Sequence, residues 1–92
     1  MAVTVKLPVQ LRASAGGASV AQVDGDTVRE ALEALFVSFP DLRERIADGD
    51  GTVRRFVNVY VSGEDIRFLQ GVDTPVGDGA ELTILPAVAG GR

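Results

Sequence analysis

One stretch of this 92-residue chain has the period of a substantial amphipathic helix, and the other apolar runs have to be arranged around it. Thr27 and Glu30 are spaced as a capping box, in which the Thr27 hydroxyl accepts from the Glu30 amide and the Glu30 carboxylate reaches back to the Thr27 amide. Pro40 ends the helix, because the residue before a proline is disfavoured in the α region. The apolar residues between these points form one stripe at helical spacing: Val28, Leu32, Leu35, Phe36 and Phe39.

On both sides of this helix, apolar residues alternate with polar ones, which is the period of a half-buried β-strand. Before the helix we expect two strands that form a hairpin, over residues 3–11 and 19–23. After it we expect one further helical turn, with Leu42 and Ile46 facing inward, and then three strands, over residues 56–61, 66–68 and 81–85. The predicted order is strand-strand-helix-strand-strand-strand, in one sheet that one helix covers on one face.

The chain contains no cysteine and no histidine. Thiolate nucleophiles, sulfur-based metal sites, the usual general base and the commonest metal ligand are therefore missing. The net charge of −4 argues against nucleic acid or an anionic membrane surface as the main partner. The sequence has neither the apolar core of a signal peptide nor a run of about 20 apolar residues, the length of a membrane span. We expect a cytoplasmic protein that is not an enzyme and carries no metal and no cofactor of its own.

Several acidic or glycine-containing patterns are interpreted as solvated turns. Asp48 begins a segment like a calcium-binding loop, but Val53 and Val59 stand where an EF-hand needs glycine and glutamate. The glycines at residues 77–79 are too few for a phosphate-binding fingerprint, and no predicted helix follows them. Neighbouring carboxylates lie in polar turn segments that do not favour acid–base catalysis: Asp24 and Asp26, and Glu64 and Asp65.

Two pairs of residues around the strand over residues 56–61 have two interpretations each. Arg54 and Arg55 are a basic pair in an acidic chain, and we interpret them as a solvated strand edge, with a partner-facing patch as the alternative. Phe56 and Tyr60 alternate with the valines that are expected to face the helix. They lie either under a loop or in an exposed apolar patch of the kind that marks an interface.

A narrow segment follows the last predicted strand. We take residues 1–86 as the folded domain and residues 87–92 as an extended tail. Pro86 fixes its own φ, the next residues are small, and Gly90 and Gly91 have no Cβ to block a close approach. Such a tail can thread a tight channel and offer a backbone carboxylate to the active site of another enzyme.

This ending resembles that of the ubiquitin-like sulfur carriers of the MoaD/ThiS family, whose fold is the β-grasp. The shared features are a Gly-Asp-Gly turn at residues 77–79, an alternating strand, Pro86 and the diglycine. The internal segments 55–61 and 64–68 are most similar to the family's carriers for cysteine synthesis. The resemblance extends over essentially the whole chain and implies an α+β fold, with a mixed sheet packed on one main helix.

The resemblance implies a protein substrate. An E1-like adenylyltransferase and sulfurtransferase would activate the Gly91 carboxylate with ATP, and sulfur would then displace AMP to leave a thiocarboxylate. A PLP-dependent cysteine synthase would receive the sulfur, and a metal-dependent peptidase would later free the cysteine, so that PLP, zinc and ATP belong to partners. The expected activation site is Gly91 with Gly90, and the expected partner-binding residues are Phe56, Tyr60, Leu85, Pro86 and Val88.

Alternatives remain open at this point. Within the family, the sulfur could be destined for molybdopterin or for the thiamin thiazole, and the sequence does not choose the pathway. Outside it, the chain could be a ubiquitin-like interaction module that binds through Phe56 and Tyr60 without acyl chemistry. Arg92 departs from the family pattern, because a peptide bond to it blocks the Gly91 carboxyl. It marks a precursor that needs trimming, a residue added for expression, or a domain that is no carrier.

Overall fold

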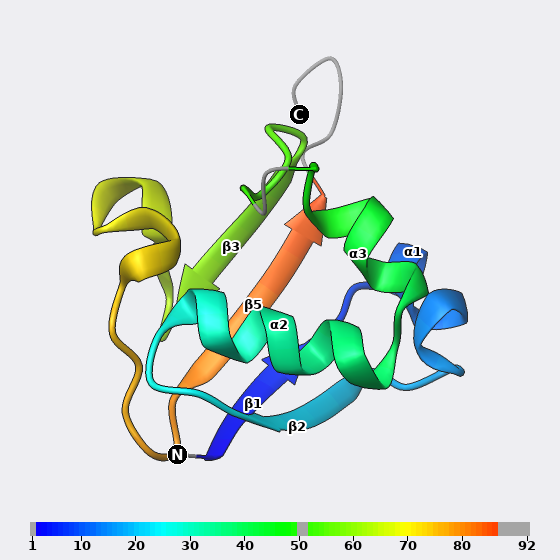
Figure 1. Cartoon of the computed structure of the whole chain (residues 1–92), viewed down its shortest axis with the longest axis horizontal. Helices are drawn as coiled ribbons and strands as arrows, with labels where there is room; N and C mark the ends of the chain where they lie inside the picture. Colours follow the sequence, from blue (N-terminus) through cyan, green and yellow to red (C-terminus); the bar gives the residue numbers. More distant parts are fainter. Residues whose placement is uncertain (1, 50–51, 87–92) are drawn as a thin grey trace.

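The described part of the chain forms one mixed sheet of five strands, and the helix α2 lies across one face of it (Figure 1). The computed structural model describes residues 2–49 and 52–86. The strand order is β2-β1-β5-β3-β4, in which β1 and β5 run parallel and the other neighbours antiparallel. This arrangement confirms the predicted α+β fold with a mixed sheet on one main helix. The strands are β1 Ala2–Lys6, β2 Val20–Asp24, β3 Val57–Val61, β4 Glu64–Asp65 and β5 Glu81–Pro86.

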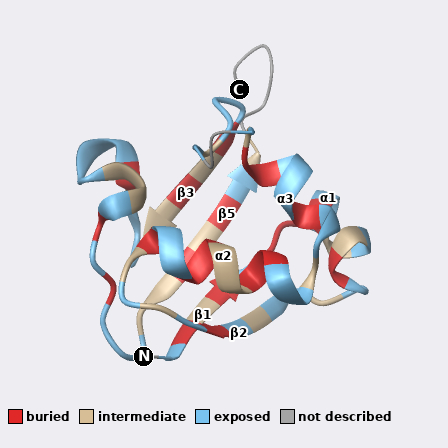
Figure 2. Ribbon diagram, viewed as in Figure 1, coloured by how far each residue is buried: buried red, intermediate tan, exposed pale blue. Residues whose placement is uncertain are grey.

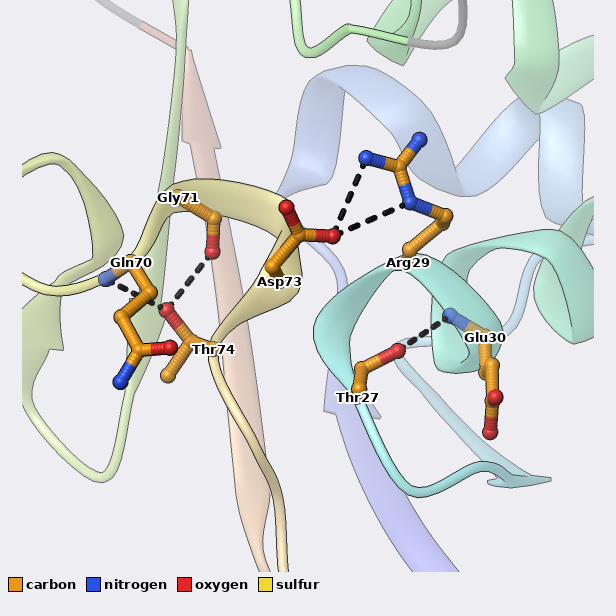
Figure 3. Close-up of polar contacts among 7 residues, drawn as sticks. All are labelled: Thr27, Arg29, Glu30, Gln70, Gly71, Asp73 and Thr74. Atoms are coloured by element: carbon orange, nitrogen blue, oxygen red, sulfur yellow. Dashed lines mark hydrogen bonds and ion pairs between the residues drawn. The ribbon is translucent and has the colours of Figure 1, made fainter.

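The main helix, α2, spans Val28–Ser38 and begins at the predicted cap. The Thr27 hydroxyl accepts a hydrogen bond from the Glu30 amide at 3.2 Å (Figure 3). The returning bond differs from the prediction, because the Glu30 carboxylate accepts from the Asp26 amide, at 2.8 Å, and not from the Thr27 amide. The chain enters the helix in an extended conformation, through a bridge between Thr27 and Pro75, and the amide that meets the carboxylate is the one before Thr27.

α2 ends before Pro40, and the predicted further turn is the helix α3, Asp41–Ile46. Arg43 of α3 donates two hydrogen bonds to the Glu33 carboxylate of α2, at 2.7 and 3.2 Å. These bonds join the two helices and lower the pKa of Glu33, because they favour its charged form. The two apolar residues of α3 are fully buried, as the sequence predicts: Leu42 and Ile46.

The first strand is shorter than predicted. β1 ends at Lys6, and Val9–Arg12 form the short helix α1, so the prediction of a strand over residues 3–11 is wrong beyond Lys6. Pro8 has no amide for a strand ladder, and with φ −73° and ψ 162° it stands as the cap of α1. The alternation continues in the sequence because two residues four positions apart face the core in a helix as well as in a strand: Leu7 and Leu11.

The segment after β3 also differs from the prediction. β4 is Glu64–Asp65, and Ile66–Phe68 form the 3₁₀ helix η2 where a strand was expected. The Asp65 carboxylate accepts from the Arg67 amide at 2.8 Å, and this cap turns the chain out of the strand. The hairpin turn before β4 consists of two residues with positive φ, 49° and 92°: Ser62 and Gly63.

The loop that follows η2 is tied to the start of α2 (Figure 3). It contains the 3₁₀ helix η3, Gly71–Asp73. The buried Thr74 hydroxyl accepts from the Gln70 amide at 3.0 Å and donates to the first carbonyl of η3 at 2.7 Å. Asp73 pairs with Arg29 of α2 at 3.2 Å. The loop is therefore closed on itself by one hydroxyl and held against the helix by one ion pair.

The core lies between the sheet and the helices (Figure 2). Residues of β1, β3 and β5 that point toward α2 and α3 are buried, and their neighbours along each strand are more exposed. This is the alternation expected of a sheet with one covered face. The largest fully buried side chains are Val3, Val5, Val28, Leu35, Leu42, Ile46, Val59, Leu82 and Ile84.

Gly25 is expected to tolerate no side chain, because it approaches the backbone of α2. A Cβ at this position would stand 2.6 Å from the amide nitrogen of Ala31. Gly25→Ala should therefore lower the free energy of unfolding, measured by urea titration, by about 2 kcal/mol. The control, Gly77→Ala, adds the same methyl group where nothing lies within 4 Å, and should change stability by less than about 0.5 kcal/mol. Equal stability of the two variants would contradict the close approach.

Candidate functional site

The face of the sheet turned away from α2 is the candidate binding surface, and we call it the open face. In its middle, Tyr60 pairs with Thr83 and Thr83 with Lys6. Alternate residues of β5 are buried in the core, so the period of two sends Thr83 and Leu85 to the other side. Leu85 is 43% exposed. We define the open face by residues of three neighbouring strands: Lys6, Asn58, Tyr60, Thr83 and Leu85.

Phe56 lies just before β3, in a turn that a hydrogen bond from the Val57 amide to the Arg54 carbonyl closes at 2.9 Å. Its side chain is 66% exposed, and Tyr60 is half-buried. Of the two interpretations that the sequence leaves for Phe56 and Tyr60, the exposed position holds for Phe56, and Tyr60 is only partly exposed. The guanidinium carbon of Arg55 lies 5.7 Å from the centre of the Phe56 ring, a cation–π contact. An exposed aromatic ring and a guanidinium group are thus in contact just before β3, whose first residue pairs with Pro86.

Arg67 holds the edge of the open face, and no pattern in the sequence marks it. Its guanidinium group donates to the Asn58 side chain at 2.6 Å and to the Val57 carbonyl at 3.0 Å. The Arg55 carbonyl accepts a longer bond at 3.3 Å. β4 pairs only with the last two residues of β3, so this side chain takes the place of a neighbouring strand along the rest of the edge.

The remaining predicted site residues belong to the end of β5. Pro86 pairs with Val57 and shares the side of the buried residues of β5, opposite to Leu85. The structure therefore separates two residues that the sequence grouped as partner-binding, because Leu85 lies on the open face and Pro86 on the helix side. Val88, Gly90 and Gly91 lie outside the described residues.

The acidic patterns interpreted as turns have structural roles. The Asp48 carboxylate accepts from the Thr52 amide at 3.2 Å, and the Asp78 carboxylate accepts from the Ala2 amide at 2.9 Å. Asp65 caps η2. Over residues 2–49 and 52–86, no group of three or more acidic side chains could hold a metal ion. In the same ranges, each helix is too short or too polar to reach across a bilayer.

A hollow of about 360 Å³ lies on the helix side of the sheet, between β3 and the segment of η2 and η3. The charged side chains at its rim are engaged, since Arg67 bonds to Asn58, Asp65 accepts from the Arg67 amide, and Asp73 pairs with Arg29. The hollow therefore offers apolar packing surface, without a nucleophile and base set to act together. Its walls are mainly aliphatic: Val53, Val57, Val59, Ile66 and Val72.

Comparisons with known proteins agree with this geometry. The ThiS family matches residues 5–91. The sulfur carrier protein CysO of Mycobacterium tuberculosis is 43% identical over 93 residues, which cover 99% of this chain and 100% of the relative. Small archaeal modifier protein 1 of Haloferax volcanii is 40% identical over 88 residues, which cover 94% of this chain and 97% of the relative. A chain of the crystal structure of the Amycolatopsis orientalis BexX/CysO complex is 42% identical, with a TM-score of 0.90 over 97% of this chain and 99% of that one.

Two neighbouring residues of β5 test which side of the sheet is open. Ile84 is fully buried, and Leu85 is 43% exposed. Ile84→Ala should lower the free energy of unfolding in urea by about 3 kcal/mol, because it leaves a cavity in the core. Leu85→Ala removes a group of similar size from the open face and should cost less than about 1 kcal/mol. The reverse order of the two losses would show that β5 is paired in another register.

Proposed function

The chain belongs to the ThiS family, and from this membership we propose that it is a sulfur carrier protein whose C-terminal carboxyl group, at Gly91, becomes a thiocarboxylate. The observation that carries the proposal is the position of β5, because this central strand leads into the diglycine segment. Five residues follow Pro86 up to Gly91, and when extended they span about 17 Å. That length brings a carboxyl group into a channel of another protein while the sheet docks outside it.

The proposed chemistry begins with activation, because a carboxylate is a weak electrophile. An E1-like adenylyltransferase binds ATP, and a Gly91 carboxylate oxygen attacks the α-phosphorus, which forms an acyl adenylate and releases pyrophosphate. Hydrosulfide then attacks the carbonyl carbon. A carbon–sulfur bond forms, the carbon–oxygen bond to the phosphate breaks, and AMP leaves with the electron pair. The proton of the hydrosulfide passes to water, and the product is a thiocarboxylate.

Arg92 has to be removed before activation in this proposal. Its peptide bond occupies the Gly91 carboxyl, and the carboxyl of the arginine itself would lie about 3.5 Å farther along an extended chain. A transfer step requires reacting atoms within a narrow range of positions, and a displacement of this size is outside it. We therefore propose that a peptidase trims the chain to Gly91.

We propose cysteine synthesis as the destination of the sulfur. The 43% identity to a protein named CysO supports this choice over molybdopterin or thiamin thiazole synthesis. The acceptor enzyme would be a PLP-dependent cysteine synthase, and a metal-dependent peptidase would release the cysteine from the carrier. ATP, PLP and the metal ion then belong to partner enzymes, and this chain contributes the carboxyl group and the surface that delivers it.

The open face is the proposed docking surface for these partners. Phe56 and Leu85 are exposed apolar residues at the end of the sheet from which the tail departs, with Tyr60 beside them. Exposed apolar residues gathered in this way are typical of interaction sites. The solved BexX/CysO complex supports the proposal, because it shows a related carrier assembled with a protein. Pro86, at the end of β5, and Val88, in the tail, would also contact the partner.

A second function uses the same activated carboxyl. The 40% identity to a small archaeal modifier protein favours conjugation, in which a lysine amine of a target attacks the acyl adenylate in place of hydrosulfide. A carbon–nitrogen bond forms, AMP leaves, and the ammonium proton passes to water. The two functions differ in the nucleophile, and the tail and docking surface serve both.

The activation site can be tested by intact mass spectrometry. A chain ending at Gly91 is incubated with the E1-like enzyme of its host, ATP, magnesium and sulfide. It should gain the mass of one oxygen-to-sulfur exchange, because its carboxyl group is free. The chain ending at Arg92 should gain no mass until a peptidase trims it. Gly91→Ala in the shortened chain should react much more slowly, because its added Cβ would clash with the walls of a channel that accepts glycine. Direct thiolation of the Arg92 form, or an inert Gly91 form, would overturn the proposal.

A further inference from the structure

Three arginines gather at one end of the sheet. Arg54 and Arg55 precede β3. Arg67 of η2 donates to the Arg55 carbonyl at 3.3 Å and to the Val57 carbonyl at 3.0 Å. We call these three residues the arginine collar. The first residue of β3 pairs with Pro86, so the collar lies beside the point where the chain leaves β5.

Carboxylates of residues 2–49 and 52–86 compensate little of the charge of the arginine collar. The Arg54 guanidinium donates to the main-chain carbonyl of Glu44 at 2.7 Å, and that of Arg55 lies over the Phe56 ring. Among the residues that the structure describes, no carboxylate lies within 4.0 Å of either group. Arg67 meets the Asp65 carboxylate only at 3.8 Å. All three side chains are exposed, in a chain whose net charge is −4.

The opposite end of the sheet is acidic. β1 and β5 run parallel, so Ala2, where β1 starts, lies at the far end of the sheet from Pro86. Two aspartates approach Ala2, one as its strand partner and one through a hydrogen bond of 2.9 Å, and two further acids follow at the start of α2. The charge therefore differs between the two ends of the sheet, with three arginines beside the exit of the tail, where Glu44 and Asp48 lie in the segment next to Arg54. The acidic residues at the other end are Asp24, Asp26, Glu30 and Asp78.

We infer that the arginine collar docks on an acidic rim around the opening through which a partner protein receives the tail. The inference rests on the proposed function and adds the chemistry of the surface that the partner must present. Attraction between the arginines and the acidic rim accelerates the association of the two proteins. The same attraction orients the carrier so that its tail faces the partner. Aromatic and arginine side chains are enriched at the centres of interfaces, and Arg55 stacked on Phe56 supplies both in one preformed unit.

BexX of Amycolatopsis orientalis is a suitable probe, because a related carrier forms a solved complex with it. The association rate constant is measured by stopped flow at about 50 mM and about 500 mM NaCl, where screening is weak and strong. Arg55→Gln is compared with Arg29→Gln, which removes the same charge at the acidic end. The Arg55 guanidinium holds no hydrogen bond among the described residues, so this variant keeps the fold, and circular dichroism checks it.

The inference predicts that Arg55→Gln lowers the association rate constant about three- to fivefold at low salt, and that the difference disappears at high salt. Arg29→Gln should bind at the rate of the unchanged chain. Equal rates for the two variants, a rate of the unchanged chain that does not depend on salt, or no binding to BexX would overturn it. Thiolation of the chain ending at Gly91 is scored separately. If that chain is thiolated but Arg55→Gln leaves the association rate constant unchanged, this inference alone is rejected. If that chain is not thiolated, the proposed function is rejected.

Discussion

The pairing of β5 on both of its edges is the constraint on which the rest of the structure depends. This strand bonds to β1 in parallel and to β3 in antiparallel orientation, so a shift along its axis would break two ladders at once. The strand that leads into the tail is therefore held in the centre of the sheet. Because β1 and β5 are parallel, the tail leaves at the end of the sheet far from Ala2, and the acidic and basic ends are separated by the same pairing.

The alternation of buried and exposed side chains in β5 determines the register in which its hydrogen bonds form. Leu82 and Ile84 are fully buried, and Thr83 and Leu85 lie on the open face. A slip by one residue would exchange the two sets and expose the core, so one arrangement is strongly favoured. The open face, the exit of the tail and the arginine collar beside it thus share one cause, which is the burial of alternate residues in this strand.

Local patterns in the sequence predict much of this fold and fail where two structures satisfy the same pattern. The cap at Thr27 and the stop at Pro40 locate α2 correctly, because both act within one turn of the helix. The first strand is predicted too long because the buried Leu7 and Leu11 fit a strand and a helix equally well. η2 is missed because a single carboxylate, that of Asp65, diverts the chain. The strand order depends on contacts between distant segments, which no local pattern encodes.

For the candidate site as well, local patterns predict one part and the tertiary fold determines the other. Alternation places Leu85 and Phe56 away from the core, but only the packed structure tells whether something covers them. Arg67 acts through bonds to residues nine and ten positions earlier, and its role follows from the tertiary fold alone. The roles of Gly90 and Gly91 rest on the family resemblance and on the chemistry of a backbone without Cβ, since these residues lie outside the described part of the chain.

The most direct measurement of the central claim is the mass of the protein isolated from the cells that make it, with fragmentation of its C-terminal peptide. A sulfur carrier is predicted to end at Gly91 in these cells, and part of the population should carry sulfur in place of one carboxyl oxygen of that residue. A population that ends uniformly at Arg92, or one in which sulfur is bound anywhere except the Gly91 carboxyl, would contradict the claim.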